Sequence, residues 1–109
     1  MEAKPPWQIA VDQFVAELKS LYGSRFSKAV LYGSRARGEA REDSDIDVVV
    51  VLDPLGDFWE ELNRISPIAS RISLEHGVVL SEFPVDSAAF AHGADALMRA
   101  ARQEGVIVE

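Results

Sequence analysis

The spacing of apolar and polar residues along this chain predicts helices and strands in alternation. Between residues 7 and 22 apolar side chains recur every three or four residues, which is the spacing of one helical stripe. The stripe consists of Trp7, Val11, Phe14, Val15, Leu18, Leu21 and Tyr22. Gly23 follows where a left-handed C-terminal cap would lie. We therefore expect a helix from about Trp7 to Tyr22.

Three apolar runs are short enough to be strands, at residues 28–32, 46–52 and 78–83, and Pro84 is expected to stop the third. A second helical stripe runs from Phe58 to about His76, with Pro67 expected to kink or split it near Ser66. A last helix is predicted over residues 87–103, weakened by Gly93, and residues 105–109 form an extended tail that would add an edge strand. The pattern favours one α/β (α+β) domain over residues 1–109, with a small mixed β-sheet and helices packed mainly on one face.

The aromatic residues Trp7, Phe58 and Trp59 fall on helical stripes, so we expect core packing, with stacking on an adenine ring as the less favoured alternative. His76 and His92 each stand beside a glycine at a helix end or irregularity. A histidine near a helix C-terminus is explained by the helix dipole. Neither histidine is assigned to a site.

Composition narrows the classes of function. The 109 residues allow one domain, and their net charge of −7 argues against a broad nucleic-acid surface. The chain has no cysteine, which removes disulfides and thiolate metal sites together. No apolar run approaches the ~20 residues of a membrane span, so a cytoplasmic location is expected.

The candidate chemistry lies between residues 30 and 52. Asp45 and Asp47 stand at the entrance of the valine-rich strand, and residues two apart on a strand point the same way. Two carboxylates on one side form a hard-oxygen site that suits Mg²⁺. Gly33 permits a sharp turn and a close approach of phosphate to the main chain, and Ser34 offers a hydroxyl and a helix N-terminus.

A small basic island accompanies these residues. Arg35, Arg37 and Arg41 lie close together in an otherwise acidic chain, in a number that suits a triphosphate better than a duplex. Alternatively, these arginines are solvated partners of the neighbouring acids Glu39, Glu42 and Asp43. A calcium-binding EF-hand loop is disfavoured because valine stands at position 48, where that loop needs glycine.

The order Gly33-Ser34, ten residues, then Asp45-x-Asp47 resembles the signature of the DNA polymerase β nucleotidyltransferase superfamily. The segment GSRARG, in so short a chain, is similar to its minimal nucleotidyltransferase branch, whose members often act as antitoxins to HEPN-domain toxins. The resemblance implies transfer of AMP from ATP to an acceptor hydroxyl. It implies that Gly33 and Ser34 hold phosphates, that Asp45 and Asp47 hold Mg²⁺, and that Arg35 or Arg37 binds phosphate.

The superfamily normally has a third carboxylate on a later strand, and here two positions compete for it. Glu82 is the acid inside the third predicted strand and is the candidate third catalytic residue, whereas Ser81 is the alternative match. The chain is too small to contain its own acceptor-binding domain, so a HEPN-type partner in a hetero-oligomer is expected to supply the acceptor. A degenerate binding module without turnover, or a nucleotidyltransferase acting on a small molecule, are the alternatives.

Overall fold

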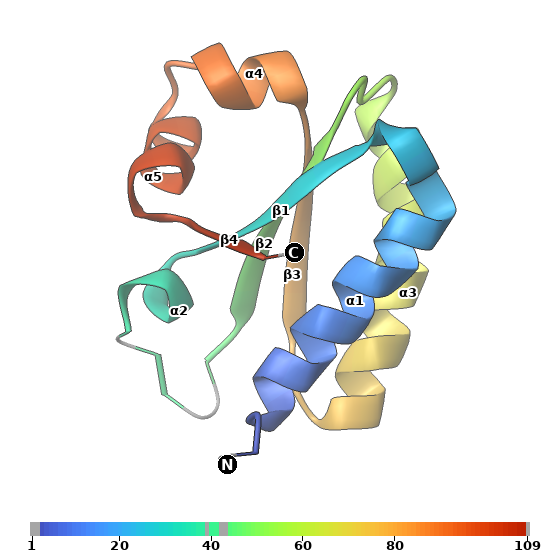
Figure 1. The fold of residues 1–109 in the computed structure, drawn as a ribbon, viewed down its shortest axis with the longest axis vertical. Helices are drawn as coiled ribbons and strands as arrows, with labels where there is room; N and C mark the ends of the chain where they lie inside the picture. Colours follow the sequence, from blue (N-terminus) through green and yellow to red (C-terminus); the bar gives the residue numbers. More distant parts are fainter. Residues whose placement is uncertain (1–2, 39, 42–43, 109) are drawn as a thin grey trace.

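Four strands form one mixed sheet in the order β3-β2-β1-β4, and the two long helices lie together on one of its faces (Figure 1). The computed structural model describes residues 3–38, 40–41 and 44–108, and for residues 34 and 35 it describes the backbone alone. In chain order the elements are α1 (Pro6–Tyr22), the 3-10 turn η1 (Gly23–Arg25), β1 (Phe26–Tyr32), α2 (Ser34–Arg37), β2 (Ile46–Leu52), α3 (Phe58–His76), β3 (Leu80–Asp86), α4 (Ser87–His92), α5 (Ala96–Glu104) and β4 (Val106–Val108). Strand β1 pairs antiparallel with β2 and β4, and β2 pairs parallel with β3, so the mixed sheet is confirmed.

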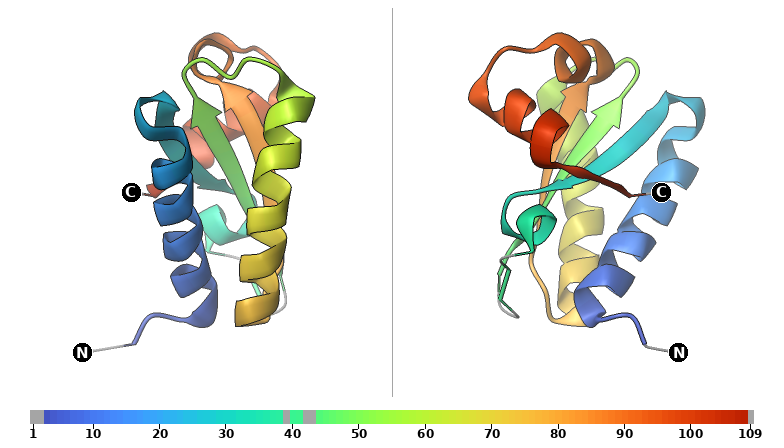
Figure 2. Two further views of the ribbon diagram at one scale, coloured as in Figure 1. Left: turned by 90° about the vertical axis from the view of Figure 1, so that its right-hand side faces the viewer. Right: turned by 60° about the vertical axis from the view of Figure 1, so that its left-hand side comes forward.

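Helix α1 follows the predicted stripe. Phe14 and Leu18 are completely buried, and α1 lies beside α3 across the same face of the sheet (Figure 2). The helix is followed by Gly23, which has a φ of 57° that residues with a side chain rarely adopt. The Gly23 N–H donates to the carbonyl of Lys19. The predicted helix and its glycine stop are both confirmed, whereas the expected left-handed cap is wrong, because a ψ of −126° lies outside the left-handed helical region.

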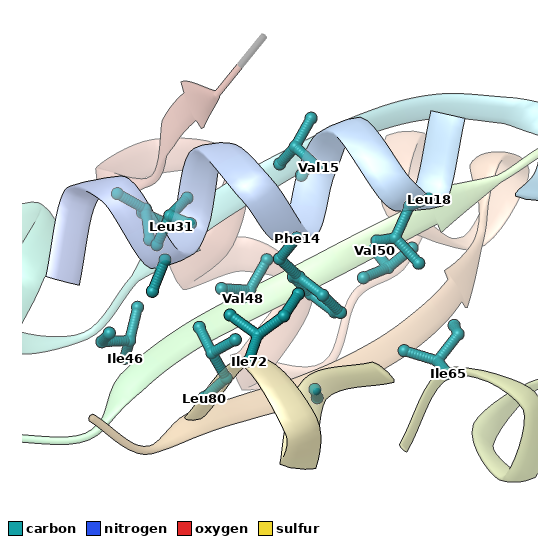
Figure 3. Packing of buried hydrophobic residues seen from close by; sticks show 14 of the residues in the cluster. Phe14, Val15, Leu18, Leu31, Ile46, Val48, Val50, Ile65, Ile72 and Leu80 are labelled. Atoms are coloured by element: carbon teal, nitrogen blue, oxygen red, sulfur yellow. The ribbon is translucent and has the colours of Figure 1, made fainter. Parts of the chain in front are cut away.

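The central strand β2 is buried on both faces because helices lie on each side of it. Val48 and Val50 pack with Phe14 of α1 and Ile72 of α3, as Figure 3 shows. Val49 and Val51 face the other side of the sheet, in a smaller cluster that includes residues of α4 and α5. Burying each such side chain contributes about 1.5 to 3 kcal/mol. This two-sided burial explains the continuous valine run and fixes which residues of β2 share a face.

Helix α3 is continuous through Pro67, so the expected split near Ser66 is wrong. A proline inside a helix costs about 3 kcal/mol, and the buried residues Ile65 and Ile72 on either side of it offset that cost by packing on the sheet. Trp59 is 68% exposed, with its ring edge-on to the Phe58 ring at a centroid separation of 5.0 Å. The expected core position of Trp59 is therefore also wrong.

Strand β3 continues through Pro84 to Asp86, so the predicted stop at Pro84 is wrong. The strand lies at an edge of the sheet. The Ile46 N–H donates to the carbonyl of Val79, and this register sends the backbone N–H groups of even-numbered β3 residues away from β2. Pro84 occupies one of these outward positions, where a missing N–H breaks no ladder bond.

The last predicted helix is two helices. Gly93 adopts an extended conformation at the end of α4, and the Asp95 carboxylate then caps α5 by accepting a hydrogen bond from the Met98 N–H. Both short helices lie on the face of the sheet opposite α1 and α3 (Figure 1). The expected edge strand forms as β4, which pairs with β1. Within the described residues, no helix combines the length and apolar character that a membrane span requires.

A buried glutamate ties the far end of β1 to α3. Glu61 is 3% exposed, and its carboxylate lies 3.2 Å from the Arg25 guanidinium and 2.8 Å from that of Arg64. The Arg25 guanidinium also donates to the carbonyls of Pro54 and Leu55. Because these contacts lie where β1 begins and the candidate chemistry lies where it ends, we assign this cluster to stability alone.

Candidate active site

The turn after β1 is in contact with the second aspartate of the pair. Gly33 has a φ of 71°, and a Cβ atom on it would lie 2.7 Å from Oδ2 of Asp47. Only glycine therefore fits this turn without displacing the carboxylate. Eleven residues of chain separate Gly33 from Asp45, and the structure brings the glycine turn to the second member of the pair, Asp47, as the sequence predicted.

The register of the sheet places a hydroxyl-bearing residue on each side of this carboxylate. Asp47 is opposite Tyr32 on β1 and opposite Ser81 on β3. Tyr32 packs against the cluster beneath α4 and α5, so this row of three residues faces that side of the sheet. Asp45 precedes β2 by one residue and is exposed. The row lies near the end of β1 and the starts of β2 and β3, at the end of the sheet where α2 is found (Figure 2).

Burial and like charge both act on Asp47. Its pKa is raised above the usual aspartate value, first because burial disfavours the charged form and second because of the negative charge of Asp45. The pKa of Tyr32 is raised for similar reasons, by burial and then by the charge of Asp47. Among the residues whose side chains are described, neither carboxylate takes part in a salt bridge. A bound cation would relieve this unfavourable electrostatic environment.

Sequence reasoning named neither Tyr32 nor its row. The position of Tyr32 directly before Gly33 could have indicated it. When two consecutive strands pair antiparallel, the last residue of the first strand lies opposite the beginning of the second strand. Recognising that signal required the β1–β2 register, which the sequence does not show.

The predicted phosphate-binding residues are only partly described. Gly33 is positioned as above, and the carbonyl of Gly33 accepts a hydrogen bond from the Arg37 N–H in the first turn of α2. The Arg37 guanidinium lies 3.6 Å from the Glu104 carboxylate and is 44% exposed. The side chains of Ser34 and Arg35 lie outside the described part of the chain, as do Glu39, Glu42 and Asp43, the acids that the alternative reading paired with the arginines.

Glu82, the expected third acid, is not brought to the aspartate pair. It is opposite Val48 on β2 and therefore faces α3, where its carboxylate accepts a 2.7 Å hydrogen bond from the Ser66 hydroxyl. Successive residues of a strand point to opposite faces, so Ser81 and not Glu82 accompanies Asp47. The predicted strand is correct, and of its two competing positions the one beside Asp47 is Ser81.

His76 and His92 remain outside the site, as predicted. The His76 ring lies at the end of α3, where its Nε2 is 2.7 Å from Oε1 of Gln13. His92 is in the last turn of α4 and is exposed. Within the described residues, no group of three or more acidic, histidine or cysteine side chains could hold a metal ion. Among the described residues of this part of the chain, the carboxylates available to a cation are therefore the two aspartates.

These two carboxylates fit Mg²⁺ in chemical type. Magnesium prefers oxygen ligands and is commonly held by one or two carboxylates together with substrate phosphates. The place that a Cβ on Gly33 would take lies against Oδ2 of Asp47, so the glycine turn and this carboxylate adjoin. This arrangement of turn and carboxylates is the kind found in enzymes that bind a nucleoside triphosphate together with a divalent cation.

The comparison with protein families identifies that class. Residues 11–85 match the family described as the nucleotidyltransferase domain, a stretch that begins in α1, ends in β3 and includes the turn and both aspartates. The chain belongs to the nucleotidyltransferase domain family. The resemblance inferred from Gly33-Ser34 and Asp45-x-Asp47 is thus confirmed.

Two individual comparisons support the same assignment. A protein of Methanocaldococcus jannaschii, provisionally named a protein adenylyltransferase, is 38% identical over 72 residues, which cover 66% of this chain and 66% of that relative. A second protein of the same organism with the same provisional name is 30% identical over 71 residues, covering 65% of this chain and 71% of the relative. The match thus spans about two thirds of these relatives.

Solved structures share the fold. A nucleotidyltransferase structure from Sulfolobus solfataricus superimposes with a TM-score of 0.69 at 17% identity, covering 97% of this chain and 87% of that one. A toxin-antitoxin structure with AMP-PNP superimposes with a TM-score of 0.57 at 18% identity, covering 88% of this chain and 70% of that one. At these identities the comparison establishes the fold, and the predicted nucleotidyltransferase fold is confirmed.

Proposed function

We propose that this chain transfers AMP from ATP to an acceptor hydroxyl on a protein partner, in a reaction that requires Mg²⁺. The acceptor oxygen loses its proton and bonds to the α-phosphorus, and the β- and γ-phosphates leave as pyrophosphate. The observation that carries the proposal is the contact of Gly33 with the Asp47 carboxylate. It joins a turn that phosphate can approach to an acidic pair that a cation would stabilise. A transferase of this kind needs its phosphate grip and its cation ligands in one place.

The proposed roles follow from the chemistry of each group. Gly33 and Ser34 bind the β- and γ-phosphates through main-chain N–H groups and the serine hydroxyl, and Arg35 or Arg37 adds charge-assisted hydrogen bonds to phosphate. Asp45 and Asp47 hold Mg²⁺, which when bound neutralises charge on the phosphates. Since Asp47 belongs to the buried central strand and Asp45 directly precedes it, the cation and the triphosphate are held in a fixed orientation.

The acceptor is proposed to lie on another protein. Both relatives carry names of protein adenylyltransferases, and one structural neighbour is a toxin-antitoxin structure, which supports a proteinaceous acceptor and an antitoxin role. The resemblance to minimal nucleotidyltransferases adds a HEPN-domain toxin as the specific partner. Modification of a toxin hydroxyl by AMP would then neutralise the toxin.

The test is transfer of labelled AMP. The protein is incubated with its co-purifying partner, Mg²⁺ and ATP labelled at the α-phosphate, and the partner is examined by intact-mass spectrometry for an added AMP. Asp45→Asn and Asp47→Asn should each abolish labelling, whereas Asp12→Asn, which changes a carboxylate on α1, should not. Labelling that persists in both site variants would exclude the proposed site.

A second function is favoured by one observation. Ser81, and not an acid, lies opposite Asp47 on β3. A site without a carboxylate at this position of β3 suits a module that binds ATP and its partner without turnover. Such a module would retain ATP binding and partner neutralisation, and no AMP adduct would appear on the partner.

A further inference from the structure

The three parts of the site follow one another across the sheet. The Gly33 turn belongs to β1, Asp47 belongs to β2, and Ser81 belongs to β3. Neighbouring strands are about 4.8 Å apart, so the Ser81 side chain begins about one strand spacing from Asp47, on the side away from the turn. Ser81 therefore occupies the place next to the carboxylate pair that is farthest from the phosphate grip.

The face of Ser81 is fixed by its neighbours. Leu80 is buried in the core beneath α1 and α3, whereas Val85 belongs to the cluster beneath α4 and α5. Alternation along the strand places Ser81 on the same face as Val85 and Asp47. Ser81 is partly exposed, so its hydroxyl is within reach of solvent and ligand.

Glu82, the acid that follows Ser81 on β3, cannot supply a carboxylate at this position. Glu82 faces α3, and its carboxylate is held there by the Ser66 hydroxyl at 2.7 Å. On the other side of Asp47 stands Tyr32, whose phenol, like that of an ordinary tyrosine, is neutral at physiological pH. The row across the sheet thus contains one carboxylate between two neutral hydroxyl groups.

We infer that this chain binds one divalent cation per nucleotide, and that Ser81 is the residue that limits the site to one. This inference rests on the proposed function. Two cations in one site lie only about 3.5 to 4 Å apart, and anionic ligands must offset their mutual repulsion. Asp45 and Asp47 with the nucleotide phosphates suffice for one Mg²⁺, and the neutral hydroxyl of Ser81 supplies no charge for a second.

The test counts cations. The protein is dialysed to equilibrium against Mn²⁺ and a non-hydrolysable ATP analogue, and the ratio of bound Mn²⁺ to bound nucleotide is measured after correction for the free complex. The unaltered protein should give a ratio of one. Ser81→Asp, which adds a carboxylate to the row, should raise the ratio to two.

Two controls separate charge from size and from position. Ser81→Asn has nearly the shape of aspartate without its charge, and the ratio should remain one. Ser70→Asp adds the same charge on an exposed position of α3, and the ratio should again remain one. Circular dichroism and a thermal melt confirm that each variant folds.

The outcomes are distinct. A ratio of two in the unaltered protein overturns this inference while leaving the proposed function intact. No bound nucleotide and no bound Mn²⁺ overturns both. A folded Ser81→Asp variant that keeps a ratio of one overturns the assignment to Ser81.

Discussion

Replacing Gly33 with alanine tests the geometry on which the active site depends. At a φ of 71° an L-residue costs about 1 to 2 kcal/mol relative to glycine. The new Cβ would also lie 2.7 Å from Oδ2 of Asp47, so the carboxylate or the turn must move. Because Oδ2 is the end of a side chain that can rotate away, this collision adds less than the backbone strain. The expected loss of unfolding free energy is therefore about 1 to 3 kcal/mol, or at least ~4 °C in Tm.

The chain provides a matched control at the end of α3. Gly77 has a φ of 65°, and a Cβ on it would have no atom within 4 Å. Gly77→Ala therefore carries the backbone strain without the collision, and should cost only about 1 to 2 kcal/mol. A double variant, Gly33→Ala with Asp47→Ala, removes the carboxylate oxygens that the new methyl group meets. The cost of Gly33→Ala should be smaller in that background.

Urea unfolding with linear extrapolation gives the free energies, and binding of ATP with Mg²⁺ gives the functional effect. Gly33→Ala should weaken nucleotide binding at least tenfold, because the phosphate-binding turn and the carboxylate are both displaced, whereas Gly77→Ala should leave binding unchanged. Equal stability losses at the two glycines, together with unchanged binding in Gly33→Ala, would refute the reasoning.

The remaining predictions concern the charges and the core. Burial and the charge of Asp45 raise the folded-state pKa of Asp47 above the ordinary aspartate value of 3.8. Without a cation, its contribution to stability therefore falls as pH rises from 3.8 through the folded-state pKa. Asp47→Asn should make the cation-free protein more stable at pH 7 and flatten this part of the pH profile in thermal melts. Glu82→Gln should leave AMP transfer unchanged, and a large loss would mean that Glu82 reaches the site. Glu61→Ala should cost about 1 to 3 kcal/mol in urea unfolding, less than the ~3 to 5 for a fully buried pair, because its two arginine partners are 35% and 41% exposed. Phe14→Ala should cost about 3 to 5 kcal/mol in the same assay, since Phe14 is completely buried.

Local patterns predicted the site because its key residues lie in one short stretch. Gly33 was expected at a turn needing a positive φ, and it has a φ of 71°. Asp45 and Asp47 were expected at the mouth of an apolar strand, and β2 begins at Ile46 between them. Naming these residues required no knowledge of distant parts of the chain. Only the contact between the turn and the carboxylate depended on the folded structure.

The errors occurred where a residue's environment depends on distant elements. Pro84 was taken as a strand end, but an outward position on an edge strand tolerates proline. Trp59 was assigned to the core because it adjoins a helical stripe, yet the sheet covers only one side of α3 and leaves its ring exposed. Local sequence patterns show neither that β3 is an edge strand nor which side of α3 meets the sheet.

The sequence by itself determined the α/β class, the glycine turn, the paired aspartates and the family signature, because each depends on side-chain type and short spacing. Only the tertiary structure decided which hydroxyl or acid of β3 stands beside Asp47. A shift of one residue in the pairing of β2 with β3 would exchange Ser81 for Glu82. That register is set by the packing of Leu80 and Val85 on opposite faces of the sheet, through contacts between residues far apart in the chain.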